Sequence, residues 1–276
     1  MVKKLIRFFV ICLVLVLIGS CVYVVIDSQI PGQHRAYVRD DVAYQKPQEL
    51  DSEHYFIDQS QVNNGYILCY LPANWYLIME QTPSGLHSTT FFASDETKAY
   101  KIPLSYGNGE YKFTVVSKEK YTVETVIINA SNLDENVIYT MSNDIVNFSS
   151  SELVSKIASD LFKKSSSDYD YLSLVVDYIH KTITYDYDQR DADMFLSIDN
   201  ILAKGVGVCY EHAKLLTALM RVKNIPCKLV FGDFGPNKDY HAWCEVTIDG
   251  KSYIADPTSG FITTIDDSRY SRTKVY

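Results

Sequence analysis

A glycine-rich turn that leads into a cysteine constrains this chain more than any other feature. The segment Gly205-Val-Gly-Val-Cys209-Tyr-Glu-His-Ala213 places one thiol where an apolar-periodic helix begins. His241-Ala-Trp243 and Ala255-Asp256-Pro257 follow it, each in a segment whose pattern predicts a β-strand. A thiol at a helix N-terminus, a histidine and an aspartate, in that chain order, are the components of a cysteine nucleophile system.

The histidine and the aspartate belong to one predicted hairpin. Asp249-Gly250 is a strong type I′ turn signal, so Ile248 should pair with Lys251. Counting back along this register makes His241 and Asp256 diagonal neighbours on one face of the hairpin. The carboxylate can then hold the tautomer of the imidazole and stabilise its cation.

Cys209 needs activation, because a free thiol is mostly protonated near neutral pH. In the first turn of a helix it faces unpaired backbone N–H groups and the positive end of the helix dipole, which favour the thiolate. The same N–H groups can hold an oxyanion on an attacked carbonyl. Gly205 and Gly207 allow a sharp turn and leave room for a substrate. We therefore expect Cys209 to be the nucleophile.

A zinc site is the main alternative, since Cys209-x-x-His212 and His241-x-x-Cys244 resemble a set of four ligands. Residues three apart on a strand point to opposite faces, so the second pair cannot chelate easily. The sequence therefore favours neither a metal nor a cofactor. By the same parity Cys244 should face away from His241, in the core or in an occasional bridge to Cys227.

Two further histidines carry weaker signals. His212, one helical turn after Cys209, is an alternative general base, but no nearby residue would orient it. His180 falls late in an amphipathic helical pattern, which indicates a surface position.

The N-terminus predicts an association with a membrane. Lys3, Lys4 and Arg7 precede an apolar run from Phe8 to Ile26 that is about long enough to cross a bilayer. We expect residues 1–29 to form a membrane anchor or signal segment with the rest of the chain outside the cytoplasm. A retained transmembrane helix, a lipoprotein modified at Cys21 and a cleaved secretory signal all remain open.

The remaining sequence divides into three segments. Residues 30–53 are polar and irregular and predict a stalk. Residues 54–147 show short alternating strands with turn signals at Asn63-Asn64-Gly65 and Gly107-Asn108-Gly109, which is typical of a small β-sandwich. In residues 148–276 helices precede an antiparallel sheet, so this segment should be α+β.

Within the last segment, periodicity predicts the individual elements. Ser149 and Glu152 give a capping-box signal for the first helix. A second helix should follow Ser165–Ser167, and a third should run from Val208 to about Lys223. The expected strands are Cys227–Phe231, His241–Ile248 and Lys251–Asp256.

The net charge of −8 and the absence of a basic patch argue against nucleic-acid binding. Outside the membrane segment the chain has four cysteines, too few for a disulfide framework. A thiol kept free outside the cytoplasm is more often retained for reactivity than for packing.

The motifs together resemble the transglutaminase-like superfamily, in which a papain-like core uses cysteine, histidine and aspartate in that order. The matching stretches, within about residues 150–260, are Gly207-Val-Cys209-Tyr-Glu-His-Ala213, Asn224-Ile-Pro226, His241-Ala-Trp243 and Asp256-Pro257-Thr258. The resemblance implies that Cys209 is the nucleophile, His241 the base and Asp256 the residue that orients it. It also implies a β-domain before the catalytic one, as in bacterial surface members. No calcium-loop signature is present.

The resemblance implies acyl transfer to, or hydrolysis of, a peptide or carboxamide group. Cross-linking enzymes, peptidases, amidases and members without known activity share this fold, so the reaction stays open. A surface protein or cell-wall peptide is the expected substrate, from location alone. The alternative is a catalytically inactive adhesion or assembly module on the same fold.

Overall fold

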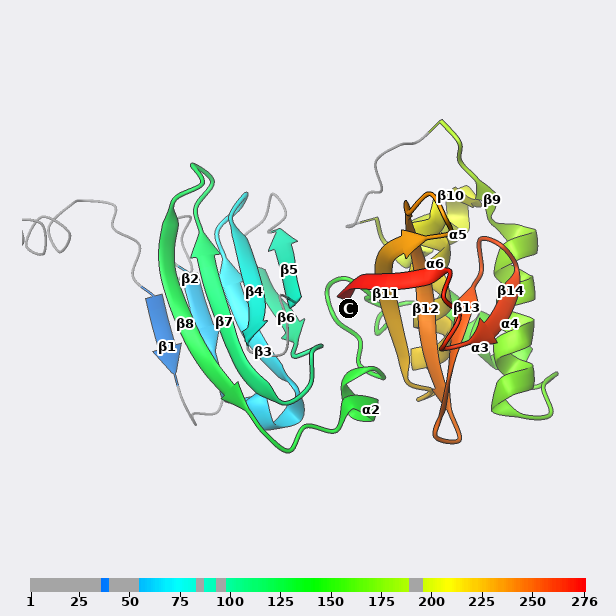
Figure 1. Ribbon diagram of the computed structural model, residues 1–276, viewed down its shortest axis with the longest axis horizontal. Coiled ribbons are helices and arrows are strands. Elements are labelled where there is room, and N and C mark those ends of the chain that lie inside the picture. The colour runs from blue at the N-terminus through cyan, green and yellow to red at the C-terminus, as the bar shows by residue number, and fades with distance from the viewer. Residues whose placement is uncertain (1–35, 40–54, 83–86, 93–97, 189–195) are drawn as a thin grey trace, which may run out of the picture.

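The computed structural model describes residues 36–39, 55–82, 87–92, 98–188 and 196–276, which form two parts side by side (Figure 1). The predicted membrane segment and most of the predicted stalk lie outside these ranges. Within them, no helix is long and apolar enough to cross a membrane.

The N-terminal part consists of two four-stranded sheets. The first has the order β1-β2-β3-β6, with β1 and β2 parallel and the other pairs antiparallel. The second is antiparallel throughout, in the order β5-β4-β7-β8. The strands are β1 (Ala36–Arg39), β2 (Tyr55–Asp58), β3 (Tyr66–Leu71), β4 (Tyr76–Thr82), β5 (His87–Phe92), β6 (Lys98–Pro103), β7 (Gly109–Val116) and β8 (Thr122–Ala130), with a short 3₁₀ helix η1 (Val62–Asn64).

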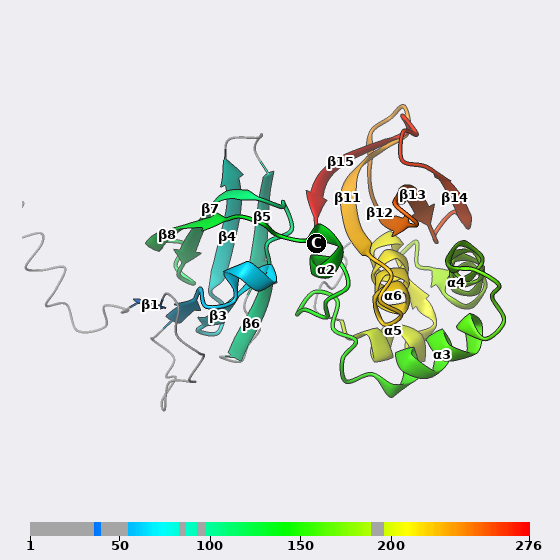
Figure 2. The same cartoon turned by 90° about the horizontal axis from the view of Figure 1, so that it is seen from below.

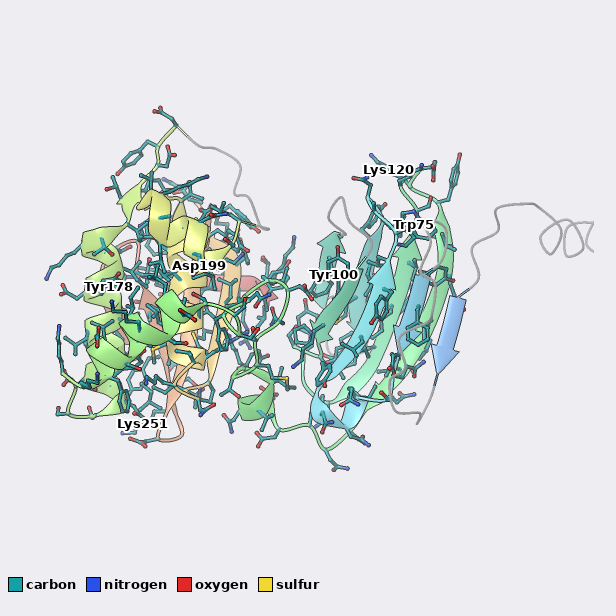
Figure 3. The ribbon with its side chains drawn as sticks, turned by 180° about the vertical axis from the view of Figure 1, so that it is seen from behind. Trp75, Tyr100, Lys120, Tyr178, Asp199 and Lys251 are labelled. Carbon is teal, nitrogen blue, oxygen red and sulfur yellow. The ribbon has the colours of Figure 1, made fainter. Side chains whose placement is uncertain are left out.

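Both predicted turns are present in this part. Gly65 ends η1 before β3 with φ of 83°, and Gly107 precedes β7 with φ of 76°, a region that favours glycine. Burial alternates along the first half of β3, as the period of a strand requires, whereas the last three residues of β3 and the last four of β7 are all buried. Trp75 and Tyr100 are also buried among these strands (Figure 3).

The C-terminal part places helices against one antiparallel sheet, which confirms the predicted α+β class. The sheet order is β14-β13-β12-β11-β15, and a short parallel pair joins β9 and β10. The helix α6 packs on β11 and β12 and is surrounded by α3, α4 and α5 (Figure 2). The helices are α2 (Glu135–Ile138), α3 (Glu152–Phe162), α4 (Asp168–Thr182), α5 (Ile198–Lys204) and α6 (Cys209–Arg221); the strands are β9 (Thr184–Tyr185), β10 (Val206–Gly207), β11 (Cys227–Phe234), β12 (Asp239–Ile248), β13 (Lys251–Asp256), β14 (Phe261–Thr264) and β15 (Tyr270–Val275).

The start of the first long helix differs from the prediction. Ser151, not Ser149, caps α3, because its hydroxyl accepts a hydrogen bond from the backbone N–H of Val154 at 3.1 Å. The hydroxyl of Ser149 instead donates to Asn147. The predicted capping box is therefore wrong, although the helix itself is present, with Val154 and Ala158 buried.

The two parts meet at the end of β15. The hydroxyl of Ser105, which follows β6, donates to the carbonyl of Val275 at 3.1 Å, and the rings of Phe91 and Tyr276 form an edge contact. The buried guanidinium of Arg221, at the end of α6, donates to carbonyl oxygens of Met141, Cys227 and Tyr276. The contacts of Ser105 and Phe91 join the sheet of the C-terminal part to the sandwich, and Arg221 holds the end of β15 against α6. The domain bounds inferred above remain a prediction.

Candidate active site

The turn before Cys209 is fixed by two glycines and a glutamate. Gly205 ends α5 with φ of 63°, in the left-handed region. Gly207 has no space for a side chain, because an added Cβ would lie 2.7 Å from the Cβ of Glu211. The carboxylate of Glu211 in turn accepts a hydrogen bond from the backbone N–H of Val208 at 2.9 Å. These contacts determine where α6 begins and place Cys209 in its first turn.

Cys209 differs from the other cysteines in its exposure. Cys69, Cys227 and Cys244 are free and buried, whereas Cys209 is free and partly exposed. The backbone N–H of Cys209 donates to the hydroxyl of Tyr185, which lies on β9. Burial raises the pKa of Tyr185, and the nearby Cys209 adds to this rise. A partly exposed thiol at a helix start is the arrangement that supports nucleophilic reactivity.

The hairpin register is the predicted one. Ile248 pairs with Lys251, and the pairing continues in step to Cys244 opposite Ala255. His241 and Asp256 meet as expected, with 2.9 Å between the ring Nε2 and Oδ2 of the carboxylate. This hydrogen bond leaves the ring Nδ1 for other partners.

Asp256 is completely buried and accepts five hydrogen bonds. Oδ2 accepts from His241, from the hydroxyl of Ser259 at 2.8 Å and from that of Tyr270 at 3.0 Å. Oδ1 accepts from the backbone N–H groups of Thr258 and Ser259. Burial alone would raise the pKa of Asp256, but the hydrogen bond and the charge of His241 outweigh it and lower the pKa. The carboxylate therefore stays ionised.

His241 connects the carboxylate to the thiol. Burial alone would lower its pKa, yet side-chain hydrogen bonds to Asp256 and Cys209 raise the pKa to about 9. Because Nε2 is hydrogen-bonded to Asp256, Nδ1 is the ring nitrogen left for the thiol of Cys209. The imidazole is positioned to take a proton from Cys209 and to hold it as a cation paired with Asp256.

A glycine in β11 lets the last strand reach this site. Gly232 pairs with His241, and an added Cβ would lie 2.0 Å from the carbonyl oxygen of Ser271 and 2.8 Å from the ring of Trp243. The pairing of β11 with β15 shifts register at this point. The close approach of β15 brings Tyr270 onto Asp256, where its ring also contacts Trp243.

Three residues that contact Asp256 or Cys209, namely Ser259, Tyr270 and Tyr185, were not identified from the sequence. Ser259 follows an Asp-Pro pair in a turn, so a local signal for it existed. Tyr270 and Tyr185 reach the site only through the sheet topology and the β9–β10 pair, and no local pattern predicts them.

The alternative histidines have other partners. His212 is buried, and its two ring nitrogens lie 2.9 and 3.0 Å from the carbonyl oxygens of Val208 and Ile183. It therefore joins the start of α6 to the end of α4. His180 is exposed, as predicted, but Nδ1 lies 3.1 Å from the carbonyl oxygen of Thr258.

The four residues considered as zinc ligands do not point to a common site. They are Cys209, His212, His241 and Cys244. The thiol of Cys244 faces α6, where it contacts the carbonyl oxygen of Ala213 and the hydroxyl of Thr217. His241 faces Asp256 instead. Within the ranges that the structure describes, no three histidine, cysteine or acidic side chains form a metal-binding group.

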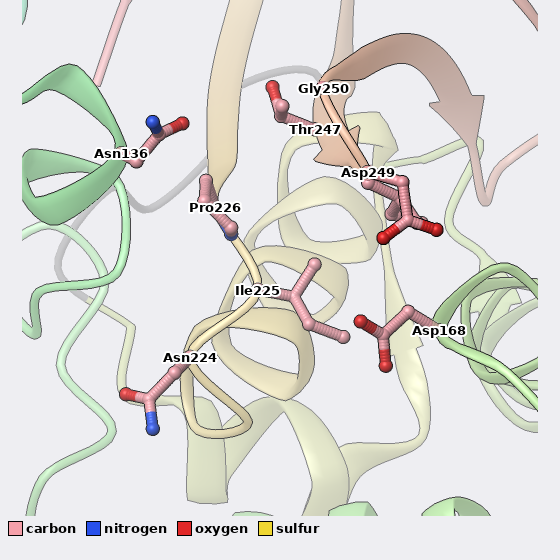
Figure 4. Close-up of a pocket in the computed structure, with 9 residues that line it drawn as sticks. Asn136, Asp168, Asn224, Ile225, Pro226, Thr247, Asp249 and Gly250 are labelled. Atoms are coloured by element: carbon pink, nitrogen blue, oxygen red, sulfur yellow. The ribbon is translucent and has the colours of Figure 1, made fainter.

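A separate pocket of about 260 Å³ lies at the other end of the β12–β13 hairpin (Figure 4). Its lining residues are Asn136, Asp168, Asn224, Ile225, Pro226, Thr247, Ile248, Asp249 and Gly250. None of Cys209, His241 and Asp256 is among them, so this pocket is not part of the candidate active site.

Comparison with known families agrees with the resemblance seen in the sequence. Residues 155–257 match the Transglutaminase-like superfamily, so the C-terminal part carries a transglutaminase-like core. No sequence among curated proteins matches this chain.

Three solved structures show more distant likenesses. A candidate cysteine protease from Cytophaga hutchinsonii aligns over 76% of this chain and 71% of its own, with 18% identity and a TM-score of 0.45. The periplasmic domain of TgpA from Pseudomonas aeruginosa aligns over 71% and 69%, with 12% identity and a TM-score of 0.38. Calcium-bound LapG from Legionella pneumophila aligns over 45% and 82%, with 13% identity and a TM-score of 0.36. At these scores, the likenesses establish neither substrate nor activity for this chain.

Proposed function

We propose that this protein is a cysteine-nucleophile acyltransferase or hydrolase acting on peptide or carboxamide groups. The observation that carries the proposal is the continuous set of contacts from Cys209 through His241 to the buried Asp256. A thiol, an imidazole and a carboxylate in contact are the parts that acyl transfer through a thioester requires.

The proposed first step forms an acyl-enzyme. The proton of the Cys209 thiol moves to Nδ1 of His241, and the sulfur forms a bond to the carbonyl carbon of the substrate. The carbon–nitrogen bond then breaks, and the imidazolium gives its proton to the departing amine or ammonia. Asp256 stabilises the imidazolium during this interval, because its carboxylate stays ionised and in contact with Nε2.

The second step releases the acyl group. His241 removes a proton from water or from an amine, which attacks the thioester carbon and frees the thiol of Cys209. Water gives hydrolysis, whereas an amine gives transfer or cross-linking. Both outcomes use the same residues, so the geometry supports the mechanism without selecting the acceptor.

The backbone N–H of Cys209 is the proposed donor to the oxyanion that develops on the attacked carbonyl. In the resting structure this N–H donates to the hydroxyl of Tyr185. A bound substrate must therefore share or displace that contact before the first step.

We also propose that the protein is held at the membrane by residues 1–29, with the catalytic part outside the cytoplasm. The support is the positively charged start and the apolar run from Phe8 to Ile26. Mass spectrometry of the native N-terminus distinguishes the anchors. An intact N-terminus indicates a transmembrane helix, a diacylglyceryl group on Cys21 indicates a lipoprotein, and a shortened unmodified chain contradicts both.

The test of the proposed chemistry is trapping of the acyl-enzyme. Incubation with glutamine-containing or cell-wall peptides should add an acyl mass to Cys209, and Cys209→Ala should abolish it with nearly unchanged thermal stability. A labelled amine then separates transfer from hydrolysis. If no adduct forms and Cys209 is no more reactive than the buried cysteines, the fold serves as a binding module instead.

A further inference from the structure

The turn that follows Asp256 is organised around its carboxylate. Thr258 and Ser259 donate their backbone N–H groups to Oδ1 at 3.0 and 3.2 Å, and the backbone N–H of Gly260 donates to the Asp256 carbonyl at 2.9 Å. The hydroxyl of Ser259 donates to Oδ2. The position of the carboxylate relative to His241 therefore depends on the conformation of residues 257–260.

His180, in the last turn of α4, contacts this turn from outside. Its Nδ1 lies 3.1 Å from the carbonyl oxygen of Thr258. Its ring lies against Gly260, where an added Cβ would be 2.8 Å from Cγ, 2.9 Å from Cδ2 and 3.1 Å from Nδ1. Gly260 has φ of 75°, so both its backbone conformation and the neighbouring ring require glycine.

The end of α4 also supports the cysteine side of the site. The carbonyl of Ile183 contacts the ring of His212 on α6, and Tyr185 accepts the N–H of Cys209. The segment from His180 to Tyr185 thus contacts both the turn that holds Asp256 and the helix start that holds Cys209.

We propose that His180 is a positioning residue that fixes the Asp256 turn against α4 and so sets the alignment of Asp256 with His241. This inference rests on the proposed function, because it assigns His180 a role in the same chemistry. The ring donates its Nδ1–H to the carbonyl oxygen of Thr258 and packs on Gly260. These two contacts hold the turn in place in addition to the hydrogen bonds within the turn itself. His180 itself touches neither the substrate nor the reacting atoms.

Two amide substitutions separate this role from simple packing. In His180→Asn the side-chain amide nitrogen falls near the place of Nδ1 and can donate to Thr258 without ionising. In His180→Gln the amide nitrogen falls nearer the place of Nε2 and cannot make that bond in the same rotamer. His180→Ala removes the group, and Lys181→Ala, an exposed substitution in the same helical turn, is the matched control.

The readout is the rate at which iodoacetamide alkylates Cys209 in the full chain, followed against pH by peptide mass spectrometry. His180→Ala and His180→Gln should slow alkylation near pH 7 by about three- to tenfold and move the rise of the alkylation rate to higher pH, because a misaligned Asp256 stabilises the His241 cation, and the thiolate paired with it, less well. His180→Asn should restore both properties, and Lys181→Ala should match the wild type.

The outcomes distinguish this inference from the proposed function. If wild-type Cys209 reacts rapidly and His180→Ala has the same rate and pH profile, the positioning role is wrong and the proposed chemistry stands. Failure of His180→Asn to restore the profile, in a variant with native circular dichroism, also overturns the positioning role. If wild-type Cys209 reacts no faster than Cys69, both proposals fail.

Discussion

The Nε2 atom of His241 lies 2.9 Å from Oδ2 of Asp256, a carboxylate with no exposure to solvent. Burying an ionised carboxylate is costly unless it is paired and fully hydrogen-bonded. Asp256 meets this condition with donors from its own turn, from His241 and from Tyr270. Donors from three segments of the chain thus hold the carboxylate in place. Single substitutions of these donors should therefore have distinguishable effects on turnover and stability.

The thiol of Cys209 should react faster with iodoacetamide than those of Cys69, Cys227 and Cys244. Only Cys209 is partly exposed and in contact with a histidine, whereas burial raises the pKa of Cys69 and Cys244. Peptide mass spectrometry after timed alkylation measures each rate. Equal labelling of all four under native conditions would contradict the enzyme proposal.

Asp256→Asn should keep the fold but reduce turnover by more than about tenfold, or roughly 1.4 kcal/mol in the barrier. The amide can hold His241 in the wrong tautomer and cannot stabilise its cation. Asp249→Asn at the hairpin tip is the matched control, because residue 249 is exposed and its φ of 50° suits asparagine. Unchanged turnover in Asp256→Asn would mean that another residue orients His241.

The pH dependence of kcat/KM should show an alkaline limb near pH 9, where His241 loses the proton that it gives to the leaving group. Removing the carboxylate in Asp256→Asn takes away a contact that raises the pKa of His241. The limb should therefore move to lower pH in that variant. A limb that stays near pH 9 would assign the titration to another group.

The same pKa shift predicts the direction of a stability change. The pKa of His241 is raised to about 9 in the folded state, above a value near 6.5 for an unfolded chain. The stabilisation from its protonated form is thus complete below about pH 6.5 and is lost as the pH rises through about 9. Urea denaturation between these values should show a larger decline in unfolding free energy for wild type than for His241→Gln.

The hairpin shows which parts of this site could be predicted from the sequence. Asp249-Gly250 defines one turn type, the strand period defines which residues share a face, and together they predict the contact of His241 with Asp256. Cys209 was predicted from an equally local signal, a glycine turn before a helix. Local signals therefore suffice to place a residue whose position is set within one turn or one hairpin.

Contacts from distant elements could not be predicted in this way. Tyr270 reaches Asp256 because β15 pairs with β11 beside Gly232, a topology that no local pattern in β15 reveals. Helix periodicity predicted His180 at the surface, but not that a turn 78 residues later would contact it. The error at Ser149 has a similar origin, since several serines compete to cap α3 and the observed cap is Ser151, whose hydroxyl also contacts Asp199.

Tyr270→Phe tests whether β15 contributes to the chemistry as well as to the sheet. The change removes the hydroxyl that donates to Oδ2 of Asp256 at 3.0 Å and keeps the ring packed on Trp243 and Phe234. With one donor fewer, the carboxylate should hold His241 less firmly. We expect a loss of about 1 kcal/mol in unfolding free energy and a reduction in turnover smaller than that of Asp256→Asn. Tyr253→Phe, in β13 of the same sheet, is the matched control for loss of a phenolic hydroxyl. If Tyr270→Phe lowers stability but leaves turnover and its pH profile unchanged, Tyr270 is structural only, and Asp256 is held in place by its own turn.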